Sequence, residues 1–365
     1  MKDKTAGLLV LLSILVALEG FSRVFYRENY LDKIKKILRE DAGLLWTQKP
    51  GLDTFFEGVS LRTNPLGFRG AAIGEKKNKR IVVMGASPAF GWGVEEAKNY
   101  SSLLAAKPGR AGIKAEVINA SVIGYSSWQG RRLLEKEIIK LKPDAVVFAY
   151  GVNDVDKYRF FRNFPAPDSR LPEKSRLSAE VSNFLFSSRF VKVYARFLEK
   201  MSSSLRSGCP AEPPVRVSPE EFAANARFFY ESSRKNGFRL VLATSPFYKP
   251  PRYYKVSCGQ SGDDKCPRTL RCRAAAGGVE KEKWLDKAAE AGLYQAYDAI
   301  QEYNETLRAY AASEKGVIFL DADLAFKKAG AEEKYFLKPE TDFVHFSEKG
   351  HEAFSELLYG VLKKL

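Results

Sequence analysis

The chain has 365 residues, 45% hydrophobic, 13% aromatic and 28% charged, which is the profile of a folded protein of one or two domains. This composition excludes a disordered chain, a collagen-like fibre and a protein with many membrane spans. Lys and Arg outnumber Asp and Glu by 59 to 44, a net charge of +15. Because there is neither a long basic run nor a zinc-finger spacing, the charge predicts a basic solvated surface and no nucleic-acid partner.

An apolar segment begins close to the N-terminus. Two lysines precede an uncharged run from Thr5 to Leu18, and Glu19 follows it. As a helix this run would rise about 21 Å, less than the hydrocarbon core of about 30 Å. The lysines place the N-terminus inside and the rest of the chain outside. We predict a signal anchor or signal peptide over residues 1–24, and we favour an uncleaved anchor because the small residues at 20–22 make a poor cleavage site. Cleavage would give a secreted protein, and a buried helix of a cytosolic protein is the remaining alternative.

The four cysteines lie in polar, loop-like sequence of the C-terminal half: Cys209, Cys258, Cys266 and Cys272. An even set of this kind is typical of disulfides in an oxidising compartment, in agreement with export. A zinc site is the alternative, but no C-x-x-C pair is present and no histidine lies near them in sequence. No cysteine lies near the N-terminus, which excludes a lipoprotein anchor.

The next segment, residues 25–78, is predicted to be a juxtamembrane lead-in. It contains a basic amphipathic helix over Tyr30–Glu40, which lies either on a membrane surface or on the protein's own surface, and then several turn sequences.

Strands and helices alternate from residue 79 onward. Five apolar runs predict strands: Arg80–Gly85, Ala115–Asn119, Ala145–Tyr150, Leu240–Thr244 and Val317–Leu320. Four segments have helical periodicity: Gln129–Leu141, Pro219–Lys235, Lys281–Ala312 and Ser347–Leu365. Strands that are apolar on both faces belong to a parallel sheet covered on both sides. The fold class is therefore α/β, a three-layer α/β/α sandwich with a mostly parallel central sheet, flavodoxin-like, preceded by an N-terminal hydrophobic anchor helix.

Two segments interrupt this alternation, about 155–217 and 247–280, and both are rich in Pro, Ser and charged residues. We predict that they are insertions over the carboxyl edge of the sheet, where open α/β folds bind ligands.

Each of the first three strands is followed by a small or polar residue. Ser87 follows the first strand, Gly124 the second and Asn153 the third. Taken singly these are ordinary turn residues. The glycines around Ser87 match neither a dinucleotide fingerprint nor a phosphate-binding loop, and Ala89 excludes the nucleophile elbow of α/β-hydrolases.

Near the C-terminus, Asp342 and His345 lie three residues apart in a predicted loop before the last helix. A carboxylate in this position can hold the Nδ1–H tautomer of the imidazole and leave Nε2 free as a base. The other histidine, His351, is predicted to be a partly exposed residue of the last helix. Asp154 and Asp321, also near strand ends, are predicted to be turn or capping residues.

The order Ser, Gly, Asn, Asp-His resembles the four blocks of the SGNH/GDSL hydrolase superfamily over residues 79–365. The segment Thr63–Gly70 is similar to the lead-in of membrane-anchored bacterial members. The resemblance implies that Ser87 is the nucleophile, His345 its general base and Asp342 the residue that orients the imidazole. It also implies an oxyanion hole made by the Ser87 and Gly124 N–H groups and the Asn153 amide, with no metal and no cofactor.

One residue departs from the family pattern: Ala86 stands where the usual Gly-Asp-Ser has its aspartate. The resemblance leads us to expect an exported serine hydrolase, its catalytic domain periplasmic or extracellular, that cleaves acyl or acetyl esters of small molecules, surface glycans or lipids through an acyl-serine intermediate. An O-acyltransferase acting on a surface glycan through the same site is one alternative. A non-catalytic binding protein with the same fold is the other, and Ala86 favours it.

Overall fold

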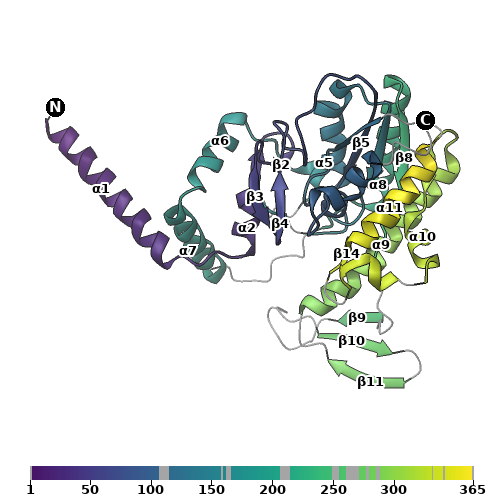
Figure 1. Ribbon diagram of the computed structural model, residues 1–365. Coiled ribbons are helices and arrows are strands. Elements are labelled where there is room, and N and C mark those ends of the chain that lie inside the picture. Colours follow the sequence, from purple (N-terminus) through teal and green to yellow (C-terminus); the bar gives the residue numbers. More distant parts are fainter. Residues whose placement is uncertain are drawn as a thin grey trace. The chain divides into compact units, whose positions relative to one another are not determined.

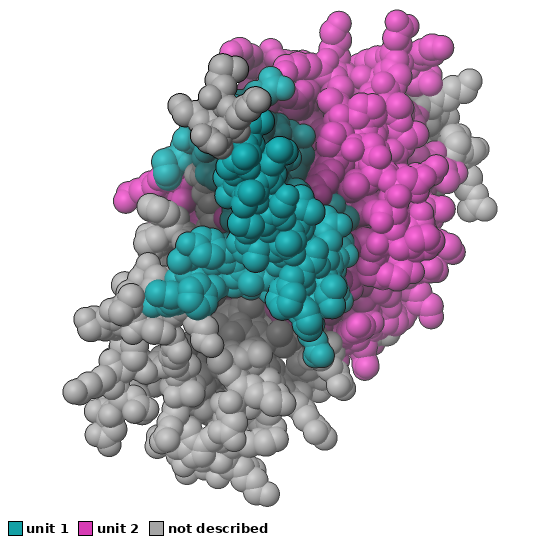
Figure 2. Space-filling model, turned by 90° about the vertical axis from the view of Figure 1, so that its left-hand side faces the viewer, with its two compact units in different colours: residues 1–46, 172–210 teal, residues 47–171, 211–365 magenta. Residues whose placement is uncertain are grey.

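The computed structural model describes residues 2–106, 115–157, 159–161, 166–205, 214–248, 255–259, 271–276, 279–284, 288–330, 332–339 and 342–363. The chain forms two compact units, coloured separately in Figure 2. Unit 1 contains residues 1–46 and 172–210, and unit 2 contains residues 47–171 and 211–365. These divisions differ from the predicted boundaries after residues 24 and 78. The middle of the first predicted insertion belongs to unit 1 because its two helices pack against N-terminal elements.

Unit 2 is built on a five-stranded parallel sheet in the order β12-β8-β7-β5-β6. Its strands are β5 (Lys79–Gly85), β6 (Ala115–Asn119), β7 (Ala145–Ala149), β8 (Arg239–Ala243) and β12 (Ile318–Leu320). All five were predicted to within one residue at each end. The central strands are buried along almost their whole length, as expected of apolar runs covered on both faces.

Helices cover both faces of this sheet (Figure 1). They are α3 (Ser87–Phe90), α4 (Tyr100–Ala105), α5 (Ser127–Leu133), α8 (Pro219–Asn236), α9 (Ala288–Ser313), α10 (Ala322–Lys328) and α11 (Glu348–Leu362). Helices α5, α8 and α9 pack in one group and α4, α10 and α11 in another. With right-handed crossovers, this strand order places the two groups on opposite faces. The predicted three-layer α/β/α fold is therefore confirmed.

Local sequence explains where α8 begins and ends. Ser218 and Glu221 form a capping box at its start, and Gly237 ends it in the left-handed conformation with φ of +73°. Phe222 and Phe229 on its inner face contact the ring of Phe148 on β7, with centroids 5.6 and 5.0 Å apart.

The other strands in the described part of unit 2 are short. They are β3 (Asp53–Phe56), β4 (Val59–Arg62), β9 (Lys255–Gly259), β10 (Arg271–Ala276), β11 (Val279–Trp284), β13 (Phe336–Lys338) and β14 (Asp342–Phe346). Cys258 and Cys272 are opposite each other in the β9–β10 register. The predicted disulfides involve cysteine side chains that lie outside the described residues, so the pairing stays a prediction.

In its described residues, unit 1 contains four helices and a short hairpin. The helices are α1 (Lys2–Phe25), α2 (Tyr30–Ile37), α6 (Arg176–Leu185) and α7 (Arg189–Leu205), and the hairpin pairs β1 (Leu38–Asp41) with β2 (Leu45–Gln48). Residues Thr5–Phe25 of α1 are long and apolar enough to cross a membrane, and the same test is passed by signal sequences. The helix extends beyond Glu19, where the predicted apolar run ended.

Three predicted helix boundaries were wrong. The helix expected over Tyr30–Glu40 ends at Ile37, because the next residues join the β1–β2 hairpin. The helix expected over Gln129–Leu141 begins at Ser127 and continues after Leu133 as single π and 3₁₀ turns. The first part of the segment Lys281–Ala312 belongs to β11, since the charge alternation there fits a strand as well as a helix.

Candidate active site

Ser87 is the first residue of α3, immediately after β5 and a single intervening alanine. Its Oγ lies 2.8 Å from Nε2 of His345. The other ring nitrogen, Nδ1, lies 2.8 Å from both carboxylate oxygens of Asp342. Asp342 and His345 were predicted to lie in a loop, but they are on β14, which pairs with β13 and so fixes their backbone. The structure thus brings together three residues that are up to 258 positions apart.

The charge of Asp342 is held in place by its surroundings. Desolvation alone would raise the pKa of this carboxyl, but hydrogen bonds from the ring and backbone of His345 outweigh it and hold the pKa below its ordinary value of 3.8. An ionised Asp342 accepts the Nδ1–H of His345, which leaves the lone pair of Nε2 directed at the Ser87 hydroxyl.

An aromatic residue that sequence reasoning missed supports the imidazole. The Trp92 indole stacks on the ring of His345 with centroids 5.1 Å apart and planes inclined by 18°. Phe56 meets Trp92 edge to face at 4.9 Å. Stacking and the Asp342 carboxylate together fix the plane of the imidazole.

The turn that carries Ser87 is fixed by bonds from outside it. Ala86 is fully buried and supplies no capping side chain to α3. Instead, the guanidinium of Arg69 donates to the carbonyls of Phe90, Gly91 and Val94. The Asn119 amide donates to the carbonyls of residues 89 and 90 at 3.1 and 3.2 Å. Arg69 lies in the lead-in segment singled out by its family resemblance, which was the available signal for this role.

The loops after the three adjacent strands β6, β5 and β7 meet at one edge of the sheet. The N–H of Val122 donates to the Gly85 carbonyl at 3.0 Å, and the amide Nδ2 of Asn153 donates to the Tyr125 carbonyl at 3.2 Å. Gly124 has a φ of +75°, which strongly favours glycine, and an added Cβ would lie 2.2 Å from the Phe160 ring. Within the described residues, the backbone N–H groups of Ser87 and Gly124 have no acceptor.

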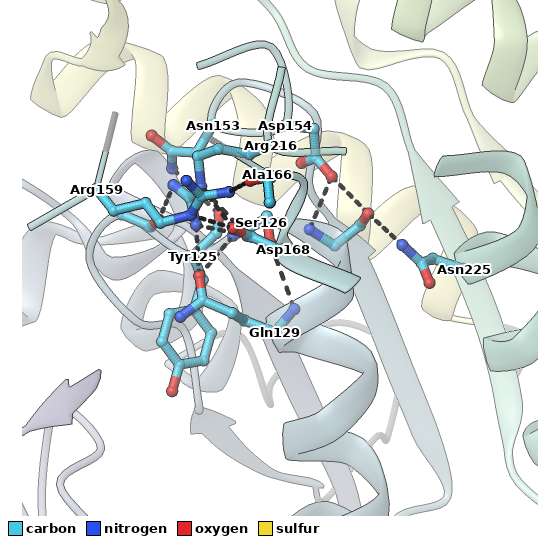
Figure 3. Close-up of polar contacts among 12 residues, drawn as sticks. Tyr125, Ser126, Gln129, Asn153, Asp154, Arg159, Ala166, Asp168, Arg216 and Asn225 are labelled. Carbon is cyan, nitrogen blue, oxygen red and sulfur yellow. Dashed lines mark hydrogen bonds and ion pairs between the residues drawn. The ribbon is translucent and has the colours of Figure 1, made fainter. Parts of the chain in front are cut away.

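A buried ionic network holds the Gly124 loop in place (Figure 3). The Arg216 guanidinium donates to the Gly124 carbonyl at 2.8 Å and to an Asp168 oxygen at 3.0 Å. Ser126 donates its hydroxyl to the same carboxylate at 2.7 Å, and Arg159 binds it from another side. The Arg216 and Asp168 side chains are 2% and 0% exposed. The positive charges of Arg216 and Arg159 outweigh the desolvation that would raise the pKa of Asp168, so its pKa stays below the ordinary value.

Three further predictions concern residues outside the series Ser87, His345 and Asp342. Asp154 accepts the N–H and hydroxyl of Ser127 and the N–H of Gly151, a turn and capping role as predicted. Asp321 is the N-cap of α10, again as predicted. The prediction for His351 was wrong: the residue is fully buried, and its Nδ1 accepts the Tyr100 N–H at 3.2 Å.

In the described part of the chain, no three His, Cys, Asp or Glu residues are grouped as a metal site requires. The chemistry available at this edge of the sheet is that of a serine, a base that can take its proton, and donors able to stabilise an anion.

The sequence matches no family model and no curated protein. GDSL-like lipases and acetylxylan esterases are among the similar solved structures. A GDSL-like lipase from Bacteroides thetaiotaomicron is 16% identical with a TM-score of 0.43, and the match covers 80% of this chain and 92% of that one. The lipase/acylhydrolase from Enterococcus faecalis is 15% identical with a TM-score of 0.42, covering 78% and 96%.

An acetylxylan esterase from Geobacillus stearothermophilus, in the form of a catalytic mutant, is likewise 15% identical with a TM-score of 0.42, covering 79% of this chain and 94% of that one. At such identities and TM-scores, the likeness shows nothing about the activity or substrate of this chain.

Proposed function

We propose that this chain is a serine esterase of the SGNH/GDSL type that cleaves carboxylic esters through an acyl-Ser87 intermediate. The observation that carries the proposal is the hydrogen-bonded series Asp342, His345 and Ser87, with 2.8 Å at both links. A serine hydroxyl is too weak an acid to attack an ester unaided, and a base oriented by a third group is the arrangement that activates it.

The reaction follows from these contacts. The Ser87 Oγ attacks the ester carbonyl carbon while its proton passes to Nε2 of His345, and Asp342 stabilises the imidazolium. The carbonyl oxygen becomes an oxyanion that accepts from the unpaired N–H groups of Ser87 and Gly124 and from the second amide hydrogen of Asn153. Each such donor contributes about 3–4 kcal/mol in the transition state. The carbon–oxygen bond to the alcohol then breaks and His345 returns the proton to the departing alkoxide.

Water completes the cycle by the same steps. It loses a proton to His345, attacks the acyl-Ser87 carbonyl and releases the carboxylic acid with Ser87 restored. If a sugar hydroxyl takes the place of water, the same acyl-enzyme gives an acyltransferase. Incubation with an acyl donor and a glycan, followed by measurement of free acid and acylated glycan, separates the two outcomes.

The proposed location is outside the cytoplasm, with α1 as the anchor. The N-terminal lysines before the apolar segment Thr5–Phe25 support this orientation. Esters of surface glycans or of lipids are then the substrates within reach. A reporter enzyme active only after export, fused to the C-terminus, tests the location: activity of the fusion supports it and inactivity of an expressed fusion contradicts it.

The test of the chemistry uses the full chain in detergent with 4-nitrophenyl acetate and a fluorophosphonate probe. Ser87→Ala and His345→Ala should abolish hydrolysis, and Ser87→Ala should also abolish labelling. His351→Asn is the matched control, because it removes the other imidazole and keeps an acceptor for the Tyr100 N–H. A folded wild-type protein that neither hydrolyses the ester nor reacts with the probe would contradict the proposal and favour a binding protein, the function that Ala86 suggested.

A further inference from the structure

Helices α6 and α7 of unit 1 expose continuous apolar stripes. On α6, Leu177, Val181, Phe184 and Leu185 follow the spacing of one helix face, and Leu177 and Phe184 are 74% and 77% exposed. On α7 the same is true of Val193, Tyr194, Phe197, Leu198 and Met201, all of them at least 41% exposed. These nine residues are called the α6–α7 face below. The two helices are consecutive in the chain, and two exposed stripes make a larger apolar surface than scattered single residues.

Three charged residues on the opposite side of α7 form ion pairs with carboxylates of α2 and of the segment just before it. Arg196 pairs with Asp32 of α2 at 2.5 Å, Lys192 approaches the same carboxylate at 3.8 Å, and Arg189 reaches Glu28 at 3.5 Å. Asp32 is only 5% exposed. The helix therefore directs these three charges toward protein carboxylates and exposes its apolar stripe, the reverse of a helix on the surface of a water-soluble domain.

The start of α7 is bonded to α1, the candidate membrane span. The Glu19 carboxylate of α1 accepts the Ser188 hydroxyl at 2.7 Å and the N–H groups of Phe190 and Arg189 at 3.1 and 3.3 Å. A carboxylate within an apolar helix is costly in hydrocarbon unless it is paired. These bonds satisfy Glu19 and attach α7 to α1 near the end of the apolar run (Figure 1).

We propose that the α6–α7 face lies in the interfacial layer of a lipid bilayer, beside the point where α1 enters it. The apolar stripes contact the acyl chains, and Tyr194 lies at the headgroup level, as aromatic residues do at membrane interfaces. Continuity with α1 favours a bilayer over a second copy of the chain as the occupant. Charge agrees, since Lys and Arg outnumber Asp and Glu by 13 to 8 in the part of unit 1 after the N-terminal lysines, residues 5–46 and 172–210, which suits a surface with anionic lipids. The inference does not depend on the proposed esterase chemistry.

Tryptophan quenching by brominated lipids tests this placement. Phe184→Trp and Phe197→Trp each put a reporter on the α6–α7 face, and Phe55→Trp is the matched control because Phe55 is an 80% exposed phenylalanine of β3 in unit 2. The full-length variants are reconstituted in vesicles of phosphatidylcholine and phosphatidylglycerol, with and without bromine on the acyl chains. We expect most of the added fluorescence at positions 184 and 197 to be lost in brominated vesicles, and that at position 55 to be retained.

Two results would overturn the proposal. The first is unquenched fluorescence at positions 184 and 197 in protein shown by flotation to be bound to the vesicles. The second is a dimer that Phe184→Asp dissociates, which would assign the α6–α7 face to a second copy. Neither measurement involves ester hydrolysis, so failure here and failure of the proposed function are distinguishable.

Discussion

In unit 2 the rings of Phe148, Phe222 and Phe229 are buried against one another, whereas in unit 1 Phe184 and Phe197 are 77% and 56% exposed. Both units contain ion pairs, but these have different roles. In unit 2 they hold a loop at the candidate site, and in unit 1 they join α7 to α2. The contrast agrees with the proposed contact of unit 1 with lipid, since apolar groups are expelled from water but not from lipid. Changes in one unit should therefore leave the function of the other intact.

The largest effect is expected from Asp342→Asn, which leaves the shape of unit 2 unchanged and removes a charge. The amide cannot hold the Nδ1–H tautomer of His345, and kcat should fall by about 10⁴-fold. Ester hydrolysis by the full chain measures this, and Asp53→Asn, at an exposed position of β3, is the control. Quenching of a tryptophan at position 184 should not change. A variant that retains activity within tenfold would show that Asp342 does not orient the base.

A smaller effect is expected from Arg216→Lys in the buried network of unit 2. Lysine keeps the charge but loses the fork that binds the Gly124 carbonyl and the Asp168 carboxylate together. The Gly124 N–H should then be less well placed, and kcat should fall by about 10-fold to 100-fold with little change in KM, a fraction of the loss from deleting an oxyanion donor.

Arg170→Lys is the control for this variant, because Arg170 is an exposed arginine of unit 2, two residues after Asp168. If Arg216→Lys lowers the melting temperature and leaves kcat unchanged, the network stabilises the fold without positioning the site.

A pH effect is expected at His351 in the core of unit 2. Burial lowers the pKa of this residue to about 3, from its ordinary value of 6.5. Between pH 6.5 and pH 3 the unfolded chain takes up a proton at His351 and the folded chain does not. The free energy of unfolding therefore decreases as the pH falls through this range, by about 1.4 kcal/mol per pH unit. When the pH falls from 7 to about 5, the free energy of unfolding should decrease by about 2 kcal/mol less in His351→Asn than in wild type.

Urea denaturation of both proteins in the same detergent measures the difference at His351. Wild type must be compared with the variant because Asp154 also titrates in this range. Burial raises the pKa of Asp154 to about 6, from its ordinary value of 3.8, so its protonation in the folded chain increases stability as the pH falls from 6 to 3.8. The Asp154 contribution is common to both proteins and cancels. If the free energies of unfolding of wild type and His351→Asn depended on pH in the same way, the assignment of this pH dependence to His351 would be contradicted.

The smallest effect on ester hydrolysis is expected from a substitution on the α6–α7 face of unit 1. Phe184→Asp puts a charge on the α6–α7 face of unit 1, whereas Ser87 belongs to unit 2. We expect kcat/KM for a soluble ester to stay within about twofold of wild type, as for substitutions at exposed positions in general. Assays in detergent and in vesicles measure it. A large loss in detergent would show that the two units are not functionally separable.

Prediction from sequence was most successful where the signal is local. The five strands are short apolar runs, and Ser87, Gly124 and Asn153 each follow one of them directly, so the parallel sheet brings them to one edge. The buried pair Asp168 and Arg216 could not be found this way. Its members are 48 residues apart, and neither lies in a periodic pattern that indicates burial.

His351 was misjudged although a signal was present. Phe354, Leu358 and Leu362 follow it at intervals of three and four, so it lies on the buried stripe of α11. The sequence of α7 also has an amphipathic pattern, but periodicity alone does not predict which face of a helix points outward. Ion pairs to α2, over 150 residues earlier in the chain, determine that orientation.

The stacking of Trp92 on His345, at 5.1 Å, gives the candidate site a natural optical signal. A neutral imidazole and an imidazolium act differently on an indole in contact with them, because the cation is drawn to the π-face and draws charge from the excited ring. The chain has four tryptophans, so the emission difference between wild type and His345→Gln isolates the contribution of Trp92. Followed during hydrolysis of an ester, that emission would report the proton on His345, the proposed general base, without a label or a chromogenic substrate.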